Sequence, residues 1–107
     1  MNETIVRPAH LTREKQQHRR QPQYHVVLVN DEDHTFDYVI RMCKVIFGHQ
    51  TERGYQIAKQ VDQQGRAIVW TGTFELAELK QDQIHGFGAD PLVTQSQGSM
   101  SAELEPA

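Results

Sequence analysis

Five consecutive polar residues, Asn30-Asp31-Glu32-Asp33-His34, follow the first apolar run of the chain. Carboxylates, an amide and an imidazole in so short a segment could coordinate a divalent cation or move a proton. Oxygen-rich clusters suit Mg²⁺, Mn²⁺ or Ca²⁺, and Asp62 could add a further carboxylate. The segment lacks the spacing of an EF-hand, however, and acidic turns between a strand and a helix are often inert.

A hydrolytic enzyme is a second possibility, because paired carboxylates beside a histidine can act as acid and base. The sequence contains no serine elbow, no glycine-rich phosphate loop and no zincin motif. The one cysteine, Cys43, falls on the apolar face of an expected helix, where a packed thiol is more common than a nucleophile. We therefore predict that the protein is not an enzyme.

Charge is distributed unevenly along the 107 residues, whose net charge is −3. Residues 1–23 carry five Lys/Arg against two Asp/Glu, whereas residues 24–107 carry six against twelve. An acidic body repels phosphate backbones, so we expect no binding to nucleic acid. No apolar run approaches the ~20 residues of a membrane span, and none at the N-terminus resembles a signal peptide. We expect a cytoplasmic protein, without membrane association and monomeric.

Composition divides the chain at about residue 23. Residues 1–23 are rich in Gln, Arg and His, and such a segment buries too little apolar surface to offset its ordering entropy. We predict that residues 1–23 are a disordered N-terminal extension and that residues 24–107 fold as one domain. The extension either keeps the protein soluble or engages a partner.

The folded part shows six segments with the periodicity of regular structure. Three short β-branched or alternating runs predict strands, and three runs with apolar residues at three- and four-residue steps predict helices. These segments are strands at 24–29, 66–71 and about 100–105, and helices that begin after Thr35, at Thr51 and after Thr73 and end at Gly48, Gly65 and Gly86–Gly88. The order β-α-α-β-α-β predicts an α+β fold, a small two-layer α/β sandwich in which a three-stranded antiparallel sheet carries the three helices.

Helix ends and apolar faces follow from the same pattern. Thr51 and Thr73 are candidate N-caps of the second and third helices, and Gly48 and Gly65 are candidate C-terminal stops. On the third helix the apolar positions recur less regularly than on the first. We expect them to be Leu76, Ala77, Leu79, Ile84 and Phe87.

Several of these segments together resemble the ClpS adaptor family. The similar segments are Tyr24 to Glu32 (YHVVLVNDE), Tyr38-Val39-Ile40 with Phe47, Gly65 to Ile68 (GRAI), Glu75 to Lys80 (ELAELK) and Leu104-Glu105. The resemblance implies the same small α/β sandwich and a protein that has no catalytic activity and needs no cofactor. Members of the family bind the N-terminal domain of a Clp AAA+ unfoldase. They bring it substrates that begin with a bulky hydrophobic residue, the N-degron.

The resemblance assigns the acidic loop to the free α-amino group of the substrate. Asn30, Asp31 and Glu32 match the binding loop of the family, and Asp62 stands where many members have a histidine with the same role. An ammonium group forms charge-assisted hydrogen bonds with carboxylates, about twice as strong as neutral ones. Substitution of histidine by Asp62 therefore keeps a hydrogen-bond acceptor at this position.

The resemblance also implies a hydrophobic pocket for the first side chain of the substrate. Its expected walls are Phe36, Val39, Ala58, Val61 and Met100. Two of these depart from the family pattern, because Phe36 replaces a methionine and Ala58 stands where a larger residue is common. We expect a pocket with an altered shape.

Docking to the unfoldase is assigned to Glu75 and Lys80 on the third helix. The two residues are five positions apart and would not form an i,i+4 ion pair, so we expect both to be free for a partner. In the family the N-terminal extension is thought to enter the unfoldase pore, and residues 1–23 have the length for it. The alternative to an adaptor is a small divalent-metal-binding or regulatory domain that uses the acidic loop 30–34.

Overall fold

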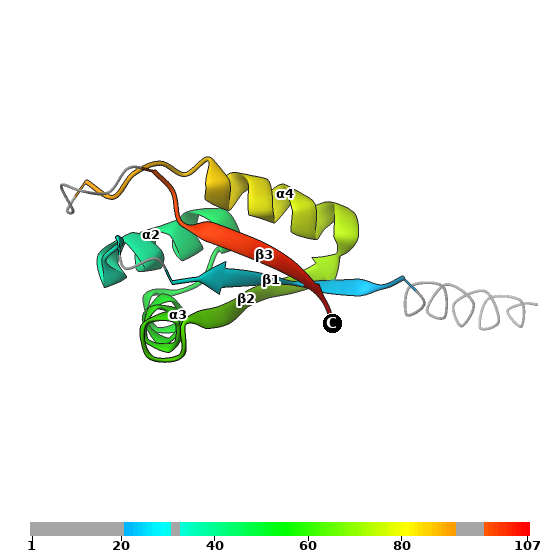
Figure 1. Ribbon diagram of the computed structural model, residues 1–107, viewed down its shortest axis with the longest axis horizontal. Coiled ribbons are helices and arrows are strands. Elements are labelled where there is room, and N and C mark those ends of the chain that lie inside the picture. The colour runs from blue at the N-terminus through cyan, green and yellow to red at the C-terminus, as the bar shows by residue number, and fades with distance from the viewer. Residues whose placement is uncertain (1–20, 31–32, 92–97) are drawn as a thin grey trace, which may run out of the picture.

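The fold has the predicted order of three strands and three helices (Figure 1). The computed structural model describes residues 21–30, 33–91 and 98–107. Its elements are β1 (Gln23–Val29), α2 (Phe36–Phe47), α3 (Thr51–Gln64), β2 (Arg66–Thr73), α4 (Phe74–His85) and β3 (Ser101–Pro106). The strands form an antiparallel sheet in the order β2-β1-β3, which confirms the predicted fold.

The central strand β1 places alternate residues on the two faces of the sheet. Val26 and Leu28 point inward and are fully buried, as expected for apolar residues with a period of two. The register against β2 shifts between Val26 and Val27. Beyond this irregularity the Trp70 ring lies over Gly72, so closely that a Cβ at Gly72 would fall on ring atoms. The sheet therefore needs glycine at position 72.

Helices α2 and α3 form a hairpin joined at Gly48, whose φ of 72° lies in the left-handed region. The helices approach closely where Gly54 faces Ile40, because a Cβ at Gly54 would lie 3.0 Å from the Ile40 Cα atom. The prediction that Thr51 caps α3 is wrong: Gln50 occupies the N-cap, and its side chain makes no capping bond. Thr73 does precede α4, also without a side-chain capping bond.

One hydrophobic core fills the space between the inner face of the sheet and the three helices. Its largest buried side chains are Leu28, Tyr38, Met42, Ile57 and Ile84. From α4 only Ala77 and Ile84 are buried, so the prediction for this helix is wrong at Leu76 and Leu79, which are each 49% exposed. Helix α4 runs beside β3 (Figure 1). It packs through one narrow stripe, Ala77 and Ile84, and leaves Phe74, Leu76 and Leu79 about half exposed.

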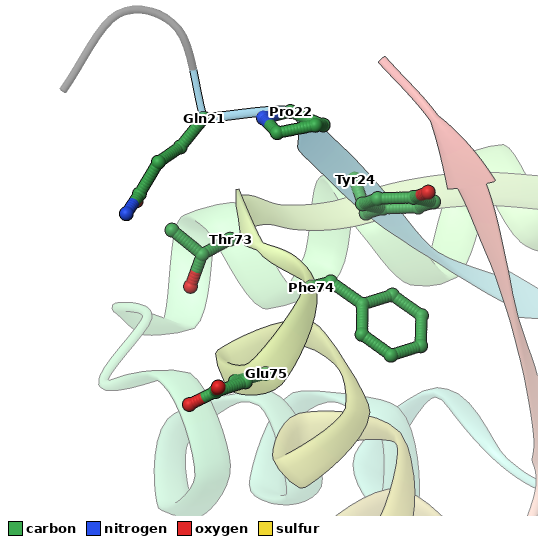
Figure 2. Close-up of a pocket in the computed structure, with 6 residues that line it drawn as sticks. All are labelled: Gln21, Pro22, Tyr24, Thr73, Phe74 and Glu75. Atoms are coloured by element: carbon green, nitrogen blue, oxygen red, sulfur yellow. The ribbon is translucent and has the colours of Figure 1, made fainter. Parts of the chain in front are cut away.

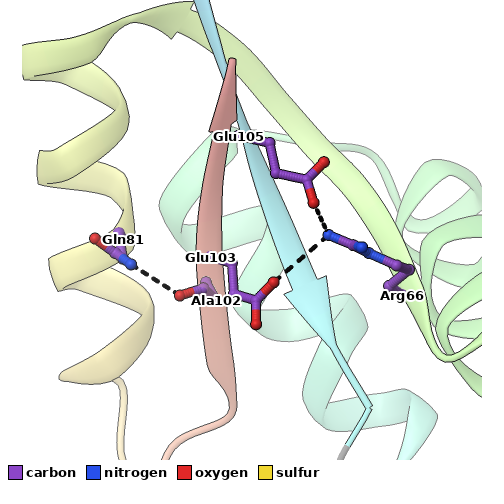
Figure 3. Close-up of polar contacts among 5 residues, drawn as sticks. All are labelled: Arg66, Gln81, Ala102, Glu103 and Glu105. Carbon is purple, nitrogen blue, oxygen red and sulfur yellow. Dashed lines mark hydrogen bonds and ion pairs between the residues drawn. The ribbon is translucent and has the colours of Figure 1, made fainter. Parts of the chain in front are cut away.

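On the outer face of the sheet, Arg66 joins the two edge strands. Its Nη2 atom forms ion pairs with Glu103, at 3.5 Å, and with Glu105 (Figure 3). Because Arg66 belongs to β2 and both glutamates to β3, the side chain spans β1. Val27, the outward residue of β1 at this level, is only 1% exposed. We infer that the Arg66 side chain covers Val27.

Helix α4 also binds the outer edge of β3 through two side chains. Gln81 Nε2 donates to the Ala102 carbonyl at 2.8 Å, and His85 Nε2 accepts from the Ala102 amide at 3.1 Å (Figure 3 shows the first bond). Both outward-pointing backbone groups of Ala102 are therefore satisfied within the chain.

Candidate functional site

The end of β1 and the end of α3 meet at the candidate α-amino site. The backbone amide of Asn30 donates to the carbonyl of Gly65 at 3.0 Å, and Gly65 is the left-handed C-cap of α3. Asp62, an exposed residue, lies three positions before Gly65. The structure thus places both Asn30 and Asp62 near the C-terminal end of α3. Asp31 and Glu32 lie outside the described residues.

The five expected pocket residues all lie in or against the single hydrophobic core of the domain. Val39, Ala58, Val61 and Met100 are 2–4% exposed, and Phe36 packs against them while only partly buried. Phe36 is the one of the five that stays partly exposed. Their role in binding stays a prediction.

Asp90 is a buried carboxylate that the sequence analysis missed. It is 2% exposed and accepts hydrogen bonds from the Thr35 amide at 2.7 Å and from the Thr35 hydroxyl at 2.9 Å. The Thr35 oxygen in turn accepts from the Tyr38 amide at 3.1 Å and so caps α2. A carboxylate at a helix N-terminus also interacts favourably with the helix dipole. Asp90 therefore fixes the start of the helix that carries Phe36.

Further contacts tie the segment after α4 to the beginning of α2. The Tyr38 hydroxyl donates to the Gly88 carbonyl at 2.5 Å, and His34 Nε2 lies 2.7 Å from the Gly98 carbonyl oxygen. Burial raises the pKa of Tyr38 above its ordinary value of 10.0. No local pattern marks these contacts in the sequence, because the partners are about 50 or more positions apart.

Glu75 lies at the predicted docking surface, exposed in the first turn of α4. Together with Thr73 and Phe74 it borders a hollow of about 390 Å³, whose opposite side is formed by Gln21, Pro22 and Tyr24 (Figure 2). The rings of Tyr24 and Phe74 meet edge-on with centroids 5.1 Å apart. Phe74, Leu76 and Leu79 are 45–49% exposed, so α4 presents an apolar surface next to Glu75.

Lys80 is not free, contrary to the sequence-based expectation. Its ammonium group donates to the Ile46 carbonyl at 2.8 Å, near the end of α2, and lies 5.7 Å from the centroid of the Phe47 ring. A cation at a helix C-terminus stabilises the helix. Lys80 thus links α4 to α2, and a docking partner would have to compete for it.

Other site types find little support in the described part of the chain. No three His, Cys, Asp or Glu side chains among the described residues are grouped closely enough to hold a metal ion, although Asp31 and Glu32 are outside that set. No helix there is long and apolar enough to cross a membrane. Burial raises the pKa of the Cys43 thiol from 9.0 to about 12, which keeps it protonated and unreactive near neutral pH.

Comparisons with known proteins agree with the geometry. Residues 19–93 match the family described as ATP-dependent Clp protease adaptor protein ClpS. The chain is 36% identical over 80 residues to the ClpS of Thermosynechococcus vestitus, covering 72% of this chain and 85% of that protein. The ClpS of Pectobacterium carotovorum is 33% identical over 91 residues, with 83% and 86% covered.

A solved structure shows the same fold. The structure of Agrobacterium tumefaciens ClpS2 bound to L-phenylalaninamide superposes with a TM-score of 0.70 at 22% identity, covering 82% of this chain and all of that one. The family match, the sequence relatives and the order of elements lead to one conclusion. The chain belongs to the ClpS family of Clp protease adaptor proteins.

Proposed function

We propose that this adaptor binds proteins by their first residue and delivers them to a Clp AAA+ unfoldase in the cytoplasm. The observation that carries the proposal is that Phe36, Val39, Ala58, Val61 and Met100 lie in or against the hydrophobic core, while Asp62, next to Val61, is exposed near the end of α3. A bulky side chain and a cationic α-amino group could be bound next to each other there. The adaptor acts by binding alone and has no catalytic step.

The ligand of a structural relative supports this substrate class. L-phenylalaninamide, which is bound to Agrobacterium tumefaciens ClpS2, has a free α-amino group and an aromatic side chain. In the present chain, Asn30 and Asp62 would hold the amino group, together with Asp31 and Glu32. An internal peptide amide carries no charge, so carboxylates favour a free terminus.

Four of the five expected pocket residues are at most 4% exposed. The fifth, Phe36, is only partly buried, and a change of its side-chain position would admit the first residue of the substrate. Phe36 is bulkier and stiffer than methionine, whereas Ala58 leaves more room than a larger side chain. We therefore expect a pocket that accepts aromatic and large aliphatic first residues.

Delivery uses a different surface. Glu75 and the exposed apolar residues Phe74, Leu76 and Leu79 on α4 would contact the N-terminal domain of the unfoldase. Lys80 would join them by exchanging the Ile46 carbonyl for a partner group. Residues 1–23 would then act as an N-terminal extension that leads to the unfoldase pore. A monomer could bind a substrate and dock on the unfoldase at once, because the pocket and α4 are separate surfaces.

The first test measures peptide binding by calorimetry. Peptides that begin with Leu, Phe, Tyr or Trp should bind, and N-acetylation of the same peptides should abolish the binding. Asp62→Asn should weaken it at least about tenfold, because a charge-assisted bond is worth about 1.5–3 kcal/mol. Asp82→Asn makes the same change on exposed α4 and should have no effect. Equal affinity for free and acetylated peptides would disprove recognition of the amino group.

The second test measures docking with a purified unfoldase N-terminal domain and a known adaptor as positive control. Glu75→Lys should weaken the complex, while Asp82→Lys, a similar charge change on the same helix, should not. If the wild-type protein fails to bind while the control adaptor binds, delivery to that unfoldase is excluded.

A further inference from the structure

Helix α4 presents three carboxylates and two leucines to solvent, on the side away from its buried stripe. This surface, here named the α4 face, consists of Glu75, Leu76, Glu78, Leu79 and Asp82. None of the three carboxylates forms an ion pair within the part of the chain that the structure describes. Lys80, the only lysine or arginine of the helix, instead donates to the Ile46 carbonyl. The α4 face therefore suits a partner segment that is basic and partly apolar.

The N-terminal extension joins the domain at the beginning of the α4 face. Gln23, the first residue of β1, pairs with Thr73, which directly precedes α4. Figure 2 shows Gln21 and Pro22 across the hollow of about 390 Å³ from the first turn of α4. Residues 1–20 lie outside the described part of the chain, and they are attached at Gln21. The extension is thus tethered next to the helix.

Residues 11–20 (LTREKQQHRR) have the charge and the length to cover the α4 face. They contain four Lys/Arg and one Asp/Glu, hence +3, which is opposite to the three carboxylates of the face. Leu11 adds an apolar side chain. The 12 residues of α4 extend about 18 Å at 1.5 Å per residue. Ten residues of extended chain reach ~33 Å, so the segment can run back along the whole helix.

We propose that residues 11–20 bind to the α4 face of their own chain and that the unfoldase must displace them in order to dock. Exposed ion pairs are weak singly. The segment is tethered at Gln21, however, and a short tether gives an effective concentration on the order of millimolar. Docking would then release the extension when the unfoldase is bound. The competition rests on the proposed docking function of α4, whereas the contact within the chain does not.

Paramagnetic relaxation enhancement tests the contact in the full-length protein. A nitroxide is attached through Thr12→Cys, since Cys43 is buried and does not compete for the label. Amide signals of residues 75–82 should broaden at about 50 mM salt and recover at about 500 mM, where screening weakens exposed ion pairs. Signals of residues 52–59 on α3 are the control and should stay sharp. No broadening on α4, or equal broadening on both helices, would overturn the proposal.

A mixed sample separates contact within one chain from contact between two. It combines isotope-labelled protein that lacks the nitroxide with nitroxide-bearing protein that lacks the isotope. The α4 signals should stay sharp in this mixture. Broadening there as strong as in the singly prepared protein would show that the extension binds a second copy, which contradicts the proposal.

A neutral extension tests the competition by calorimetry with the purified unfoldase N-terminal domain. The full-length variant carries Arg13→Gln, Lys15→Gln, Arg19→Gln and Arg20→Gln. It should bind the domain about three- to tenfold more tightly than the wild type at low salt, as expected if the α4 face is covered about 70–90% of the time. The control with Arg53→Gln and Lys59→Gln removes exposed positive charge from α3 and should bind like the wild type.

The outcomes distinguish this inference from the docking function itself. If the wild type binds the domain and the neutral extension gives equal or weaker binding, the competition is disproved and docking stands. If neither protein binds while a known adaptor does, docking through α4 and the competition for it both fail.

Discussion

The carboxylate of Asp90 accepts two hydrogen bonds from Thr35, its backbone amide at 2.7 Å and its hydroxyl at 2.9 Å, across 55 positions of sequence. Phe36 directly follows Thr35, so the segment after α4 controls where the edge of the proposed pocket lies. Asp90 is the only buried charged side chain among the described residues, and its energetic importance can be measured.

Asp90→Ala is expected to lower the free energy of unfolding by about 2–3 kcal/mol, because two part-buried donors on Thr35 would lose their charged acceptor. Thermal and urea unfolding measure the loss, with Asp82→Ala on exposed α4 as the control. Asp90→Asn keeps an acceptor and should be milder. An Asp90→Ala protein as stable as the control would show that Thr35 needs no buried partner.

Gly72→Ala is expected to displace the Trp70 ring, which occupies the space of the new methyl group. Trp70 is the only tryptophan, so its fluorescence reports the change directly. We expect a shifted emission maximum and a destabilisation of about 1–3 kcal/mol from overpacking. Gly86→Ala is the matched control, since its Cβ would come no closer than 3.4 Å to its neighbours. Identical spectra for wild type and Gly72→Ala would contradict the packing of Trp70 on Gly72.

Gly54→Val should separate α2 from α3, because the new side chain would meet the Ile40 backbone at 3.0 Å. The contact involves backbone atoms and cannot be relieved by a rotamer change, so we expect a loss of about 1–3 kcal/mol. Peptide binding should fall together with stability, since the pocket residues belong to both helices. A variant that is destabilised but binds peptides with wild-type affinity would place the pocket elsewhere.

Alkaline pH should destabilise the fold through Cys43 and Tyr38. Burial raises the pKa of Cys43 from 9.0 to about 12 and raises that of Tyr38 above 10.0. Both groups are neutral when protonated, and the unfolded chain loses these protons at lower pH than the folded one. Their contribution to stability is thus complete below about pH 9 and declines as the pH rises toward the folded-state values.

Cys43→Ala provides the test of this alkaline effect, since it removes the thiol without adding a polar group. Between pH 9 and 10 its free energy of unfolding should fall less steeply than that of the wild type. In the native wild-type protein, a thiol reagent should react with Cys43 only as fast as the chain opens. Rapid labelling at pH 7.5 would show that the thiol is accessible.

The sequence predicted those parts of the fold that depend on short-range periodicity. The apolar repeat from Phe36 to Phe47 and the β-branched run up to Val29 gave correct elements, because neighbouring residues alone set each pattern. Leu76 and Leu79 could not be assigned, since a helix packed through one narrow stripe leaves apolar residues of the same type outside the core. The capping of α3 was also missed, as Thr51 is a good N-cap residue by type but stands one position too late.

Site geometry was less accessible to sequence analysis for a related reason. The sequence identified residues that match the pattern of the ClpS family. Of these, Ala58 lies in the hydrophobic core and Phe36 packs against it. Asp90 and the Lys80–Ile46 bond depend on partners 55 and 34 positions away. Nothing close to these residues in the sequence distinguishes them from ordinary charges on a loop or helix.

The two bonds from Gln81 and His85 to Ala102 limit how other chains can associate with this protein. An exposed strand edge ordinarily offers unpaired amides and carbonyls, to which a guest segment can add as a further strand. At Ala102 both groups are already bonded to α4. Strand addition along β3 would require these bonds to break. At this position the β3 edge is thereby protected from pairing with an extended segment of another chain, and so from one route to aggregation.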